Sequence, residues 1–123
     1  MNALESAAKL GCSALQIFSV NPRMWAGGAI AARITEAEAK AFRDRREVLG
    51  LGPLVIHANY LINLAAPAPM LRTRSIQSFH EELVRGIALG ADFIVVGRQV
   101  TRSSDPRGET LRIWEEVAAV KVG

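Results

Sequence analysis

LVIHANYLINL, at residues 54–64, is the segment from which the arrangement of the chain can be read. A Gly-Pro pair precedes it, and an apolar run from Leu54 to Ile56 leads into His57. A short apolar run of this kind predicts a buried strand of a parallel sheet. Polar residues directly after such a strand lie at the carboxyl edge of the sheet, where α/β proteins place their functional groups. We therefore expect His57 to be a functional candidate at this edge.

Two more strands and four helices are predicted on either side of this segment. The other strands are ALQIF at residues 14–18 and ADFIVV at residues 91–96. Helices are predicted at residues 1–10, 35–49 and 70–89 and from residue 105 onward, and loops at residues 19–28, 59–69 and 97–104. The helix starts are marked by the capping-box spacing of Thr35 and Glu38 and by the Asp105-Pro106 pair. Glycines at positions 11, 50 and 90 mark helix ends.

Apolar spacing predicts which faces of the last two helices pack inward. The inward residues are Ile76, Phe79, Leu83 and Ile87 in one helix and Ile113, Trp114, Val117 and Val120 in the other. Arg43, Arg45 and Arg46 lie on an earlier helix, away from the strand ends, and are interpreted as a solvated face.

The resulting order, αβαβαβα, defines the fold class as α/β with a parallel sheet and right-handed crossovers. A complete (β/α)8 barrel needs at least roughly 200 residues, whereas this chain has 123. Three strands form an open sandwich or an arc of a barrel, and we expect a single domain, residues 1–123, shaped as part of a barrel. An arc leaves open sheet edges, which predicts self-association into a homo-oligomer.

Composition is typical of a soluble α/β protein, with 50% hydrophobic and 22% charged residues. The net charge of +3 is compatible with a polyanionic partner. The single cysteine, Cys12, excludes an intramolecular disulfide or a cysteine-based zinc cluster, and we expect it to be buried. No segment has the length and apolarity of a membrane span or the pattern of a signal peptide, so a cytoplasmic protein is expected.

Three segments together resemble a known family. Residues 57–64, Gln16-Ile17-Phe18 and NPRMW at residues 21–25 look like endonuclease IV, the zinc-dependent enzyme that incises DNA at abasic sites. The resemblance covers residues 2–96 and implies a partial barrel of the xylose isomerase-like TIM barrel family. It implies a role for His57 as a zinc ligand, and for Asn21, Arg23, Trp25 and Tyr60 as contacts to abasic DNA.

The resemblance also implies an incomplete catalytic centre, so no catalytic residue is assigned. Where the family has a His-Pro-Gly motif after the next strand, this chain has Gly97-Arg98-Gln99. The ligands of later strands are missing with the second half of the barrel. On the residues alone, an alternative is a strand-end histidine hydrogen-bonded to a nearby loop. For the other positions, the alternative is that Trp25 packs under a loop while Arg23 is solvated.

Residues 90–101, with the following Asp105-Pro106 pair, resemble the C-terminal end of orotidine 5'-phosphate decarboxylases. This second resemblance implies that Gly97 and Arg98 bind a phosphate group, as a glycine turn and a guanidinium fork are suited to do. It divides the chain into residues 1–96 and 97–123, joined near Val95-Val96. Two alternatives to a DNA-repair fragment follow: a phosphate- or nucleotide-binding module, and a structural chimera without activity.

Overall fold

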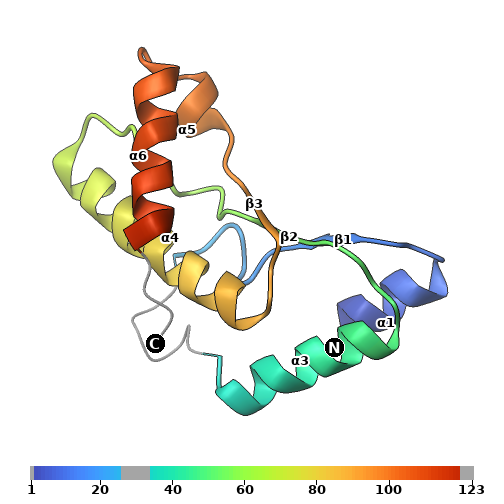
Figure 1. Ribbon diagram of the computed structural model, residues 1–123. Helices are drawn as coiled ribbons and strands as arrows, with labels where there is room; N and C mark the ends of the chain where they lie inside the picture. Colours follow the sequence, from blue (N-terminus) through green and yellow to red (C-terminus); the bar gives the residue numbers. More distant parts are fainter. Residues whose placement is uncertain (1, 26–33, 120–123) are drawn as a thin grey trace.

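The computed structural model describes residues 2–25 and 34–119 (Figure 1). In chain order the elements are α1 (Asn2–Lys9), β1 (Leu15–Ile17), α3 (Glu36–Val48), β2 (Leu54–His57), α4 (Pro69–Ala88), β3 (Phe93–Val95), α5 (Arg98–Thr101) and α6 (Pro106–Ala119). The predicted alternation of helices and strands is confirmed, with one correction. Residues 98–101, predicted as loop, form the short helix α5. Residues 26–28 of the predicted loop, and Val120 of the predicted inner face, lie outside the described residues.

The three strands form one parallel sheet, as predicted, and their order in the sheet is β1-β2-β3. Ile56 is paired with Ile17 on one side and with Ile94 on the other, and His57 is paired with Val95. Successive side chains of a strand point to opposite faces. The three isoleucines therefore share one face of the sheet, and His57 shares the other face with Val95.

Two apolar clusters hold the helices on the sheet. In Figure 1, α4 and α6 lie to the left of the strands and α1 to the right. The first joins α1 and α3 to β2 and contains Leu4, Ala7, Phe42, Leu51, Leu54, Ile56 and Leu89. The second joins α4 and α6 to the segment after β2 and contains Ala58, Ile62, Leu64, Phe79, Leu83 and Ile113. None of the helices in the described ranges is long and apolar enough to cross a membrane.

The predicted helix boundaries follow from local hydrogen bonding. The Thr35 hydroxyl accepts the Glu38 N–H at 3.2 Å while the Glu38 carboxylate accepts the Thr35 N–H at 2.8 Å, which completes the capping box. At the start of α6 the Asp105 carboxylate accepts the N–H of Gly108 at 3.0 Å. Gly90, after α4, has φ +71°, a left-handed conformation that glycine adopts without steric cost.

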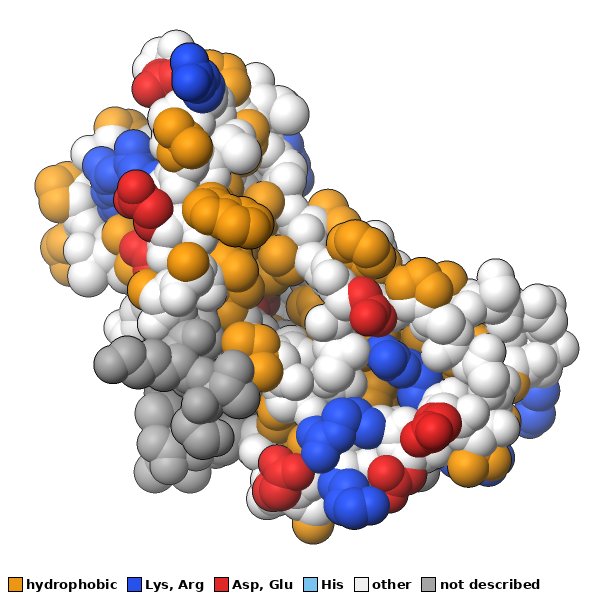
Figure 2. Space-filling model, in the orientation of Figure 1, with side chains coloured by type: hydrophobic (Ala, Val, Ile, Leu, Met, Phe, Trp, Pro, Cys, Tyr) orange, Lys and Arg blue, Asp and Glu red, His pale blue; other side chains and the backbone are white. Residues whose placement is uncertain are grey.

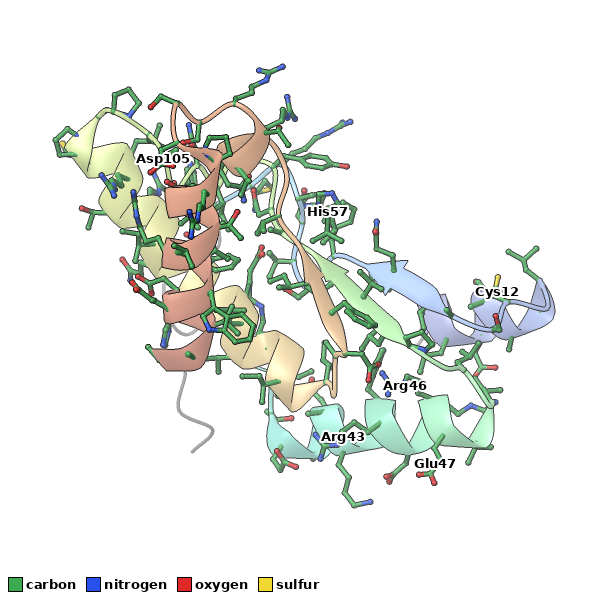
Figure 3. All side chains as sticks on the ribbon, turned by 45° about the horizontal axis from the view of Figure 1, so that its top comes forward. Cys12, Arg43, Arg46, Glu47, His57 and Asp105 are labelled. Atoms are coloured by element: carbon green, nitrogen blue, oxygen red, sulfur yellow. The ribbon has the colours of Figure 1, made fainter. Side chains whose placement is uncertain are left out.

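The arginines of α3 do not form a solvated face, which corrects the sequence-based interpretation. Arg46 donates to the main-chain oxygen of Gly90 at 2.9 Å, and Arg45 forms an ion pair with Glu5 at 2.6 Å. Arg43 donates to a main-chain oxygen at the end of α4. Figure 3 shows Arg46 extending from α3 toward the sheet, and Figure 2 shows acidic and basic side chains interspersed over this helix. Long cationic side chains on an amphipathic helix can satisfy carbonyl groups at the end of a neighbouring helix.

Three predictions of burial are wrong. Cys12 is exposed because it lies in the turn between α1 and β1, outside both apolar clusters (Figure 3). Trp114 is 70% exposed because α6 packs through Ile113, and the next residue on a helix points about 100° away. Ile87 is 39% exposed near the end of α4, where Leu83 is the residue that joins the core.

Candidate functional site

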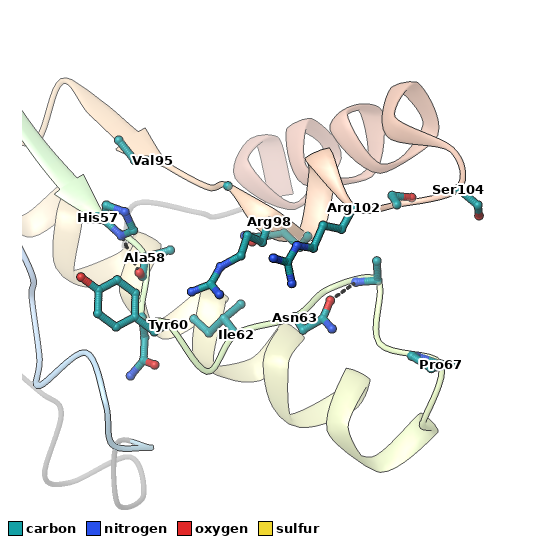
Figure 4. A pocket seen from close by; sticks show the side chains of 15 residues that line it. His57, Ala58, Tyr60, Ile62, Asn63, Pro67, Val95, Arg98, Arg102 and Ser104 are labelled. Carbon is teal, nitrogen blue, oxygen red and sulfur yellow. Dashed lines mark hydrogen bonds between the residues drawn. The ribbon is translucent and has the colours of Figure 1, made fainter.

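A cleft of about 760 Å³ opens at the carboxyl ends of β2 and β3. The segment after β2 forms one wall, and α5 with the residues that follow it forms the other (Figure 4). The polar residues that line the cleft are His57, Asn59, Tyr60, Asn63, Arg98, Gln99, Arg102, Ser103 and Ser104. Among the described residues, no carboxylate lines it and two guanidinium groups do. The electrostatic potential of this cleft therefore favours an anion.

Arg98 and Arg102 reach the cleft from the same side. They are one helical turn apart, so their side chains lie together, and Figure 4 shows both extending toward the segment that carries Ile62 and Asn63. Guanidinium groups offer several donors in a planar fork that matches phosphate oxygens. Gly97 precedes this pair and lines the cleft, but a Cβ built there meets no atom within 4 Å. Space therefore does not require glycine at this position.

His57 ends β2 and lies among aromatic rings at the mouth of the cleft. Its ring centroid is 5.0 Å from that of Phe18 and 5.6 Å from that of Tyr60. Its Nδ1 atom lies 2.8 Å from the main-chain oxygen of Ala58. A carbonyl oxygen at this distance favours the tautomer with the proton on Nδ1 and the lone pair on Nε2. The acceptor belongs to the residue that follows His57 in the chain, so this bond orients the imidazole locally.

The described residues do not fit a zinc site. Zinc in proteins takes three or four ligands that converge from different elements. No group of three or more His, Cys, Asp or Glu side chains with suitable spacing occurs within residues 2–25 and 34–119. His57 therefore stands there as a single imidazole, and we derive no chemical step through a metal.

Main-chain oxygens of the loop at residues 21–25 accept hydrogen bonds from the segment after β2. The Asn59 side chain donates from Nδ2 to the main-chain oxygens of Asn21, at 3.2 Å, and Met24, at 2.6 Å. The Tyr60 N–H donates to the main-chain oxygen of Pro22 at 3.0 Å. These bonds place the loop beside Tyr60, which is 50% exposed and lines the cleft. Two loops that follow different strands thus form one continuous surface.

Within this loop the predicted residues have different surroundings. The Asn21 side chain accepts the Arg23 N–H at 3.0 Å and so shapes the turn, and Arg23 itself is exposed. Trp25 is partly buried against the second apolar cluster, and the guanidinium carbon of Arg74 lies 4.4 Å from the centre of its ring. An indole covered in this way packs under the loop, which is the alternative considered for it, while Arg23 is the residue free to meet solvent.

A buried carboxylate beneath these loops was not identified from the sequence. Glu82 of α4 is 2% exposed, and both of its carboxylate oxygens accept the N–H of Asn59, at 3.0 and 3.2 Å. Burial raises the pKa of Glu82 to about 7, against the opposing effects of the Asn59 hydrogen bond and of Arg85. The one available signal was its position three residues after Phe79, on the inward side of the helix.

The structure thus assembles only part of the predicted set in the cleft. His57, Tyr60, Gly97 and Arg98 line it together, and Asn21 adjoins it through the hydrogen bonds of the loop. Arg23 and Trp25 do not line it. Residues that line the cleft but were not predicted include Asn59, Asn63, Arg102, Ser103 and Ser104.

Parallel strands joined by helices, with a polar cleft at their carboxyl edge, place the chain in the class of α/β proteins that carry their sites at this edge. Residues 4–120 match the family described as xylose isomerase-like TIM barrel, and the chain belongs to that family. The match extends beyond residue 96, where the resemblance seen in the sequence ends. The resemblance of the C-terminal stretch to orotidine 5'-phosphate decarboxylase stays a prediction.

Similar proteins carry the name endonuclease 4. A probable endonuclease 4 of Solibacter usitatus is 41% identical over 119 residues, which cover 96% of this chain and 37% of that protein. Endonuclease 4 of Thermus thermophilus is 40% identical over 94 residues, which cover 76% of this chain and 33% of that protein. A crystal structure of endonuclease IV from Thermus thermophilus superimposes with a TM-score of 0.74 and 35% identity over 96% of this chain and 42% of that chain. The predicted partial barrel is confirmed, and the chain spans less than half the length of each of these proteins.

Proposed function

We propose that this chain is a DNA-repair protein fragment of the endonuclease IV type that binds DNA at abasic sites and lacks a complete catalytic centre. The reaction of the parent enzyme would be zinc-dependent hydrolysis of the phosphodiester 5' to the lesion. Here Asn21, Arg23 and Tyr60 would contact DNA, and Trp25 would support their loop from below. His57 would be the remnant of a metal site.

The observation that carries this proposal is the joining of two loops beside an anion-favouring cleft. Asn59 and Tyr60 donate hydrogen bonds to main-chain oxygens of the 21–25 loop, so Arg23 and Tyr60 lie on one surface. Arg98 and Arg102 supply positive charge in the adjoining cleft. A damaged duplex offers both phosphates and an unpaired gap, which guanidinium and aromatic groups recognise. The names of the similar proteins support the same assignment.

The test is binding and incision of two duplexes that differ only in one abasic site, with zinc present. We expect preferential retardation of the damaged duplex without incision. Arg23→Ala should reduce this preference, whereas Arg107→Ala, on the exposed start of α6, should not. Equal retardation of both duplexes that fades with salt would reduce the interaction to arginine and phosphate alone and overturn the proposal.

Incision in the same assay would contradict the part of the proposal that concerns catalysis. Incision abolished by a chelator and by His57→Ala would mean that a working metal site is completed outside the described residues or by another copy. The control is zinc-dependent thermal stabilisation, because a ligand that binds only the folded state raises its melting temperature. A single imidazole binds zinc too weakly to form a site. We therefore expect zinc to shift the melting temperature of the wild type and of His57→Ala equally.

A second candidate function, binding of phosphate or nucleotide at Gly97 and Arg98, is favoured by one specific observation. Arg102 lies beside Arg98 in the same cleft, with no described carboxylate to compete for either guanidinium group. Titration with a nucleoside monophosphate distinguishes it from the first function. Loss of binding in Arg98→Ala but not in His57→Ala supports it, and unchanged binding in both variants contradicts it.

Self-association is the third part of the proposal. β1 and β3 are the edges of the described sheet, and Phe93 at the start of β3 is 62% exposed. Unpaired edges next to exposed apolar side chains promote association. Light scattering that shows a monomer over a wide concentration range would argue against a homo-oligomer, and it would leave the cleft and its ligands unaffected. The cytoplasmic location expected from the sequence is retained as part of this proposal.

A further inference from the structure

The buried carboxylate of Glu82 lies where α4 passes beneath the segment after β2. Its two oxygens accept a single main-chain N–H, that of Asn59, at 3.0 and 3.2 Å. A carboxylate that is 2% exposed has lost its hydration, so this hydrogen bond is a principal compensation for its burial. The position of the Asn59 main chain is therefore linked to the state of Glu82.

Asn59 transmits this link to the 21–25 loop. Its side chain donates to the main-chain oxygens of Asn21 and Met24, and its Oδ1 atom accepts the Leu61 N–H at 2.8 Å. Asn59 is 6% exposed, so these bonds form without competition from bulk water. One buried amide thus connects α4, the segment after β2 and the loop after β1.

Arg85, one turn further along α4, contacts the beginning of the same loop. Its Nε atom donates to the hydroxyl of Ser19 at 3.1 Å, and its positive charge opposes the rise in the pKa of Glu82. The negative charge of Glu81 in turn opposes the lowering of the pKa of Arg85 by burial. Ser19 and Asn59, which approach from the other elements, are uncharged. The charged groups that bear on Glu82 in the described ranges therefore belong to α4 itself.

We propose that Glu82 is a positioning residue that sets the placement of the 21–25 loop through Asn59. The ionised carboxylate is the stronger acceptor and holds the Asn59 main chain, so the Asn59 side chain is in place to bond the loop. A protonated carboxyl accepts less strongly and loosens the same chain of contacts. The loop is then held more firmly at alkaline than at mildly acidic pH. Any consequence for DNA binding rests on the proposed function.

Trp25 reports on the loop directly. The chain has two tryptophans, so Trp114→Phe leaves Trp25 as the only one. In this background, acrylamide quenching of Trp25 is measured between pH 5 and pH 9, a range centred on the pKa of Glu82, which burial raises to about 7. We expect quenching to increase as the pH falls through this region, and we expect Glu82→Gln to abolish the change, because its amide oxygen accepts the same N–H at every pH.

Two controls identify the titrating group. Glu81→Gln changes the adjacent, less buried carboxylate and should leave the profile intact. His57→Gln removes an imidazole two residues before Asn59, and it should also leave the profile intact. A profile that survives in Glu82→Gln, or disappears in His57→Gln, would overturn the proposal.

Asn59→Ala provides a second route if Glu82→Gln does not fold. It retains the carboxylate but removes both bonds to the loop, so Trp25 should be easily quenched at every pH. A profile unchanged in Asn59→Ala would overturn the proposal as well. Abasic-duplex binding measured at the two extremes of pH separates the two ideas. A Trp25 response without DNA binding contradicts only the proposed function, and DNA binding without a Trp25 response contradicts only the role of Glu82.

Discussion

The Nδ2 atom of Asn59 donates to the main-chain oxygen of Met24 across 2.6 Å, and this contact joins loops that follow two different strands. The same nitrogen donates to Asn21 at 3.2 Å. The surface on which DNA contact is proposed therefore depends on the Asn59 amide, together with the bond from the Tyr60 N–H to the main-chain oxygen of Pro22. Substitutions of Asn59 and of residues around it test the site most directly.

Asn59→Ala should release the 21–25 loop. The substitution removes the hydrogen bonds from Asn59 Nδ2 to the main-chain oxygens of Asn21 and Met24, and each such bond contributes about 0.5–1.5 kcal/mol. We expect faster tryptic cleavage after Arg23 and a lower melting temperature. Asn63→Ala is the matched control, because the Asn63 side chain bonds the nearby Ala65 N–H and does not reach this loop. Equal cleavage of both variants would contradict the role of Asn59.

Glu82→Gln should change how stability depends on pH. Burial raises the pKa of Glu82 to about 7 from 4.5, so the folded state binds this proton more tightly than the unfolded state does. The stabilising effect of the proton is complete below the unfolded pKa and is lost as the pH rises through the folded one. Relative to Glu82→Gln, the wild type should lose about 3 kcal/mol between pH 4.5 and pH 8. Urea unfolding at several pH values measures this, and parallel curves would contradict it.

Arg98→Ala and Arg102→Ala should weaken anion binding in the cleft. Each guanidinium that neutralises a phosphate adds to the salt dependence of DNA affinity, so each substitution should reduce the slope of log K against log salt by about 1. Fluorescence anisotropy with a labelled duplex, repeated over a range of salt concentrations, provides both affinity and slope. Arg107→Ala removes an exposed arginine that does not line the cleft and should leave the slope unchanged.

Gly90→Ala and Gly11→Ala should destabilise the fold by similar amounts. Both glycines have φ +71°, where an alanine costs about 1–2 kcal/mol. A Cβ at Gly11 meets no atom within 4 Å, and one at Gly90 lies 3.4 Å from Cδ of Arg43, an ordinary van der Waals distance. Backbone strain therefore determines the loss at both positions. Chemical denaturation of the two variants measures the losses, and a clearly larger loss at Gly90 would show that the contact with Arg43 is unfavourable.

Much of the fold follows from signals that act over a few residues. The Thr35 capping box, the Asp105 cap and the glycine at position 90 fix helix ends through bonds or backbone angles that neighbouring residues complete. The run from Leu54 to Ile56 has no polar side chain to expose, so a buried strand was the natural prediction. The position of His57 at the carboxyl edge of the sheet follows from that strand alone.

Burial of individual side chains was harder to predict because helical spacing gives a face but not its neighbours. Trp114 was assigned to the same face as Ile113, yet α6 packs through Ile113 and leaves the indole exposed. Glu82 is charged and was left unassigned, although it is among the least exposed residues. Arg43 and Arg46 of α3 donate to carbonyl oxygens at the end of α4 and just after it, more than 40 residues away in the sequence.

The order of strands and helices, their caps and the strand-end histidine are properties of the local sequence, because each depends on backbone preferences and apolar spacing within one element. Three features depend on tertiary structure. They are the hydrogen bonds between Asn59 and the 21–25 loop, the burial of Glu82, and the position of Arg98 across the cleft from the segment after β2. Each of these joins groups from different elements, and hydrogen bonding and desolvation act on them only once the chain has brought those elements together.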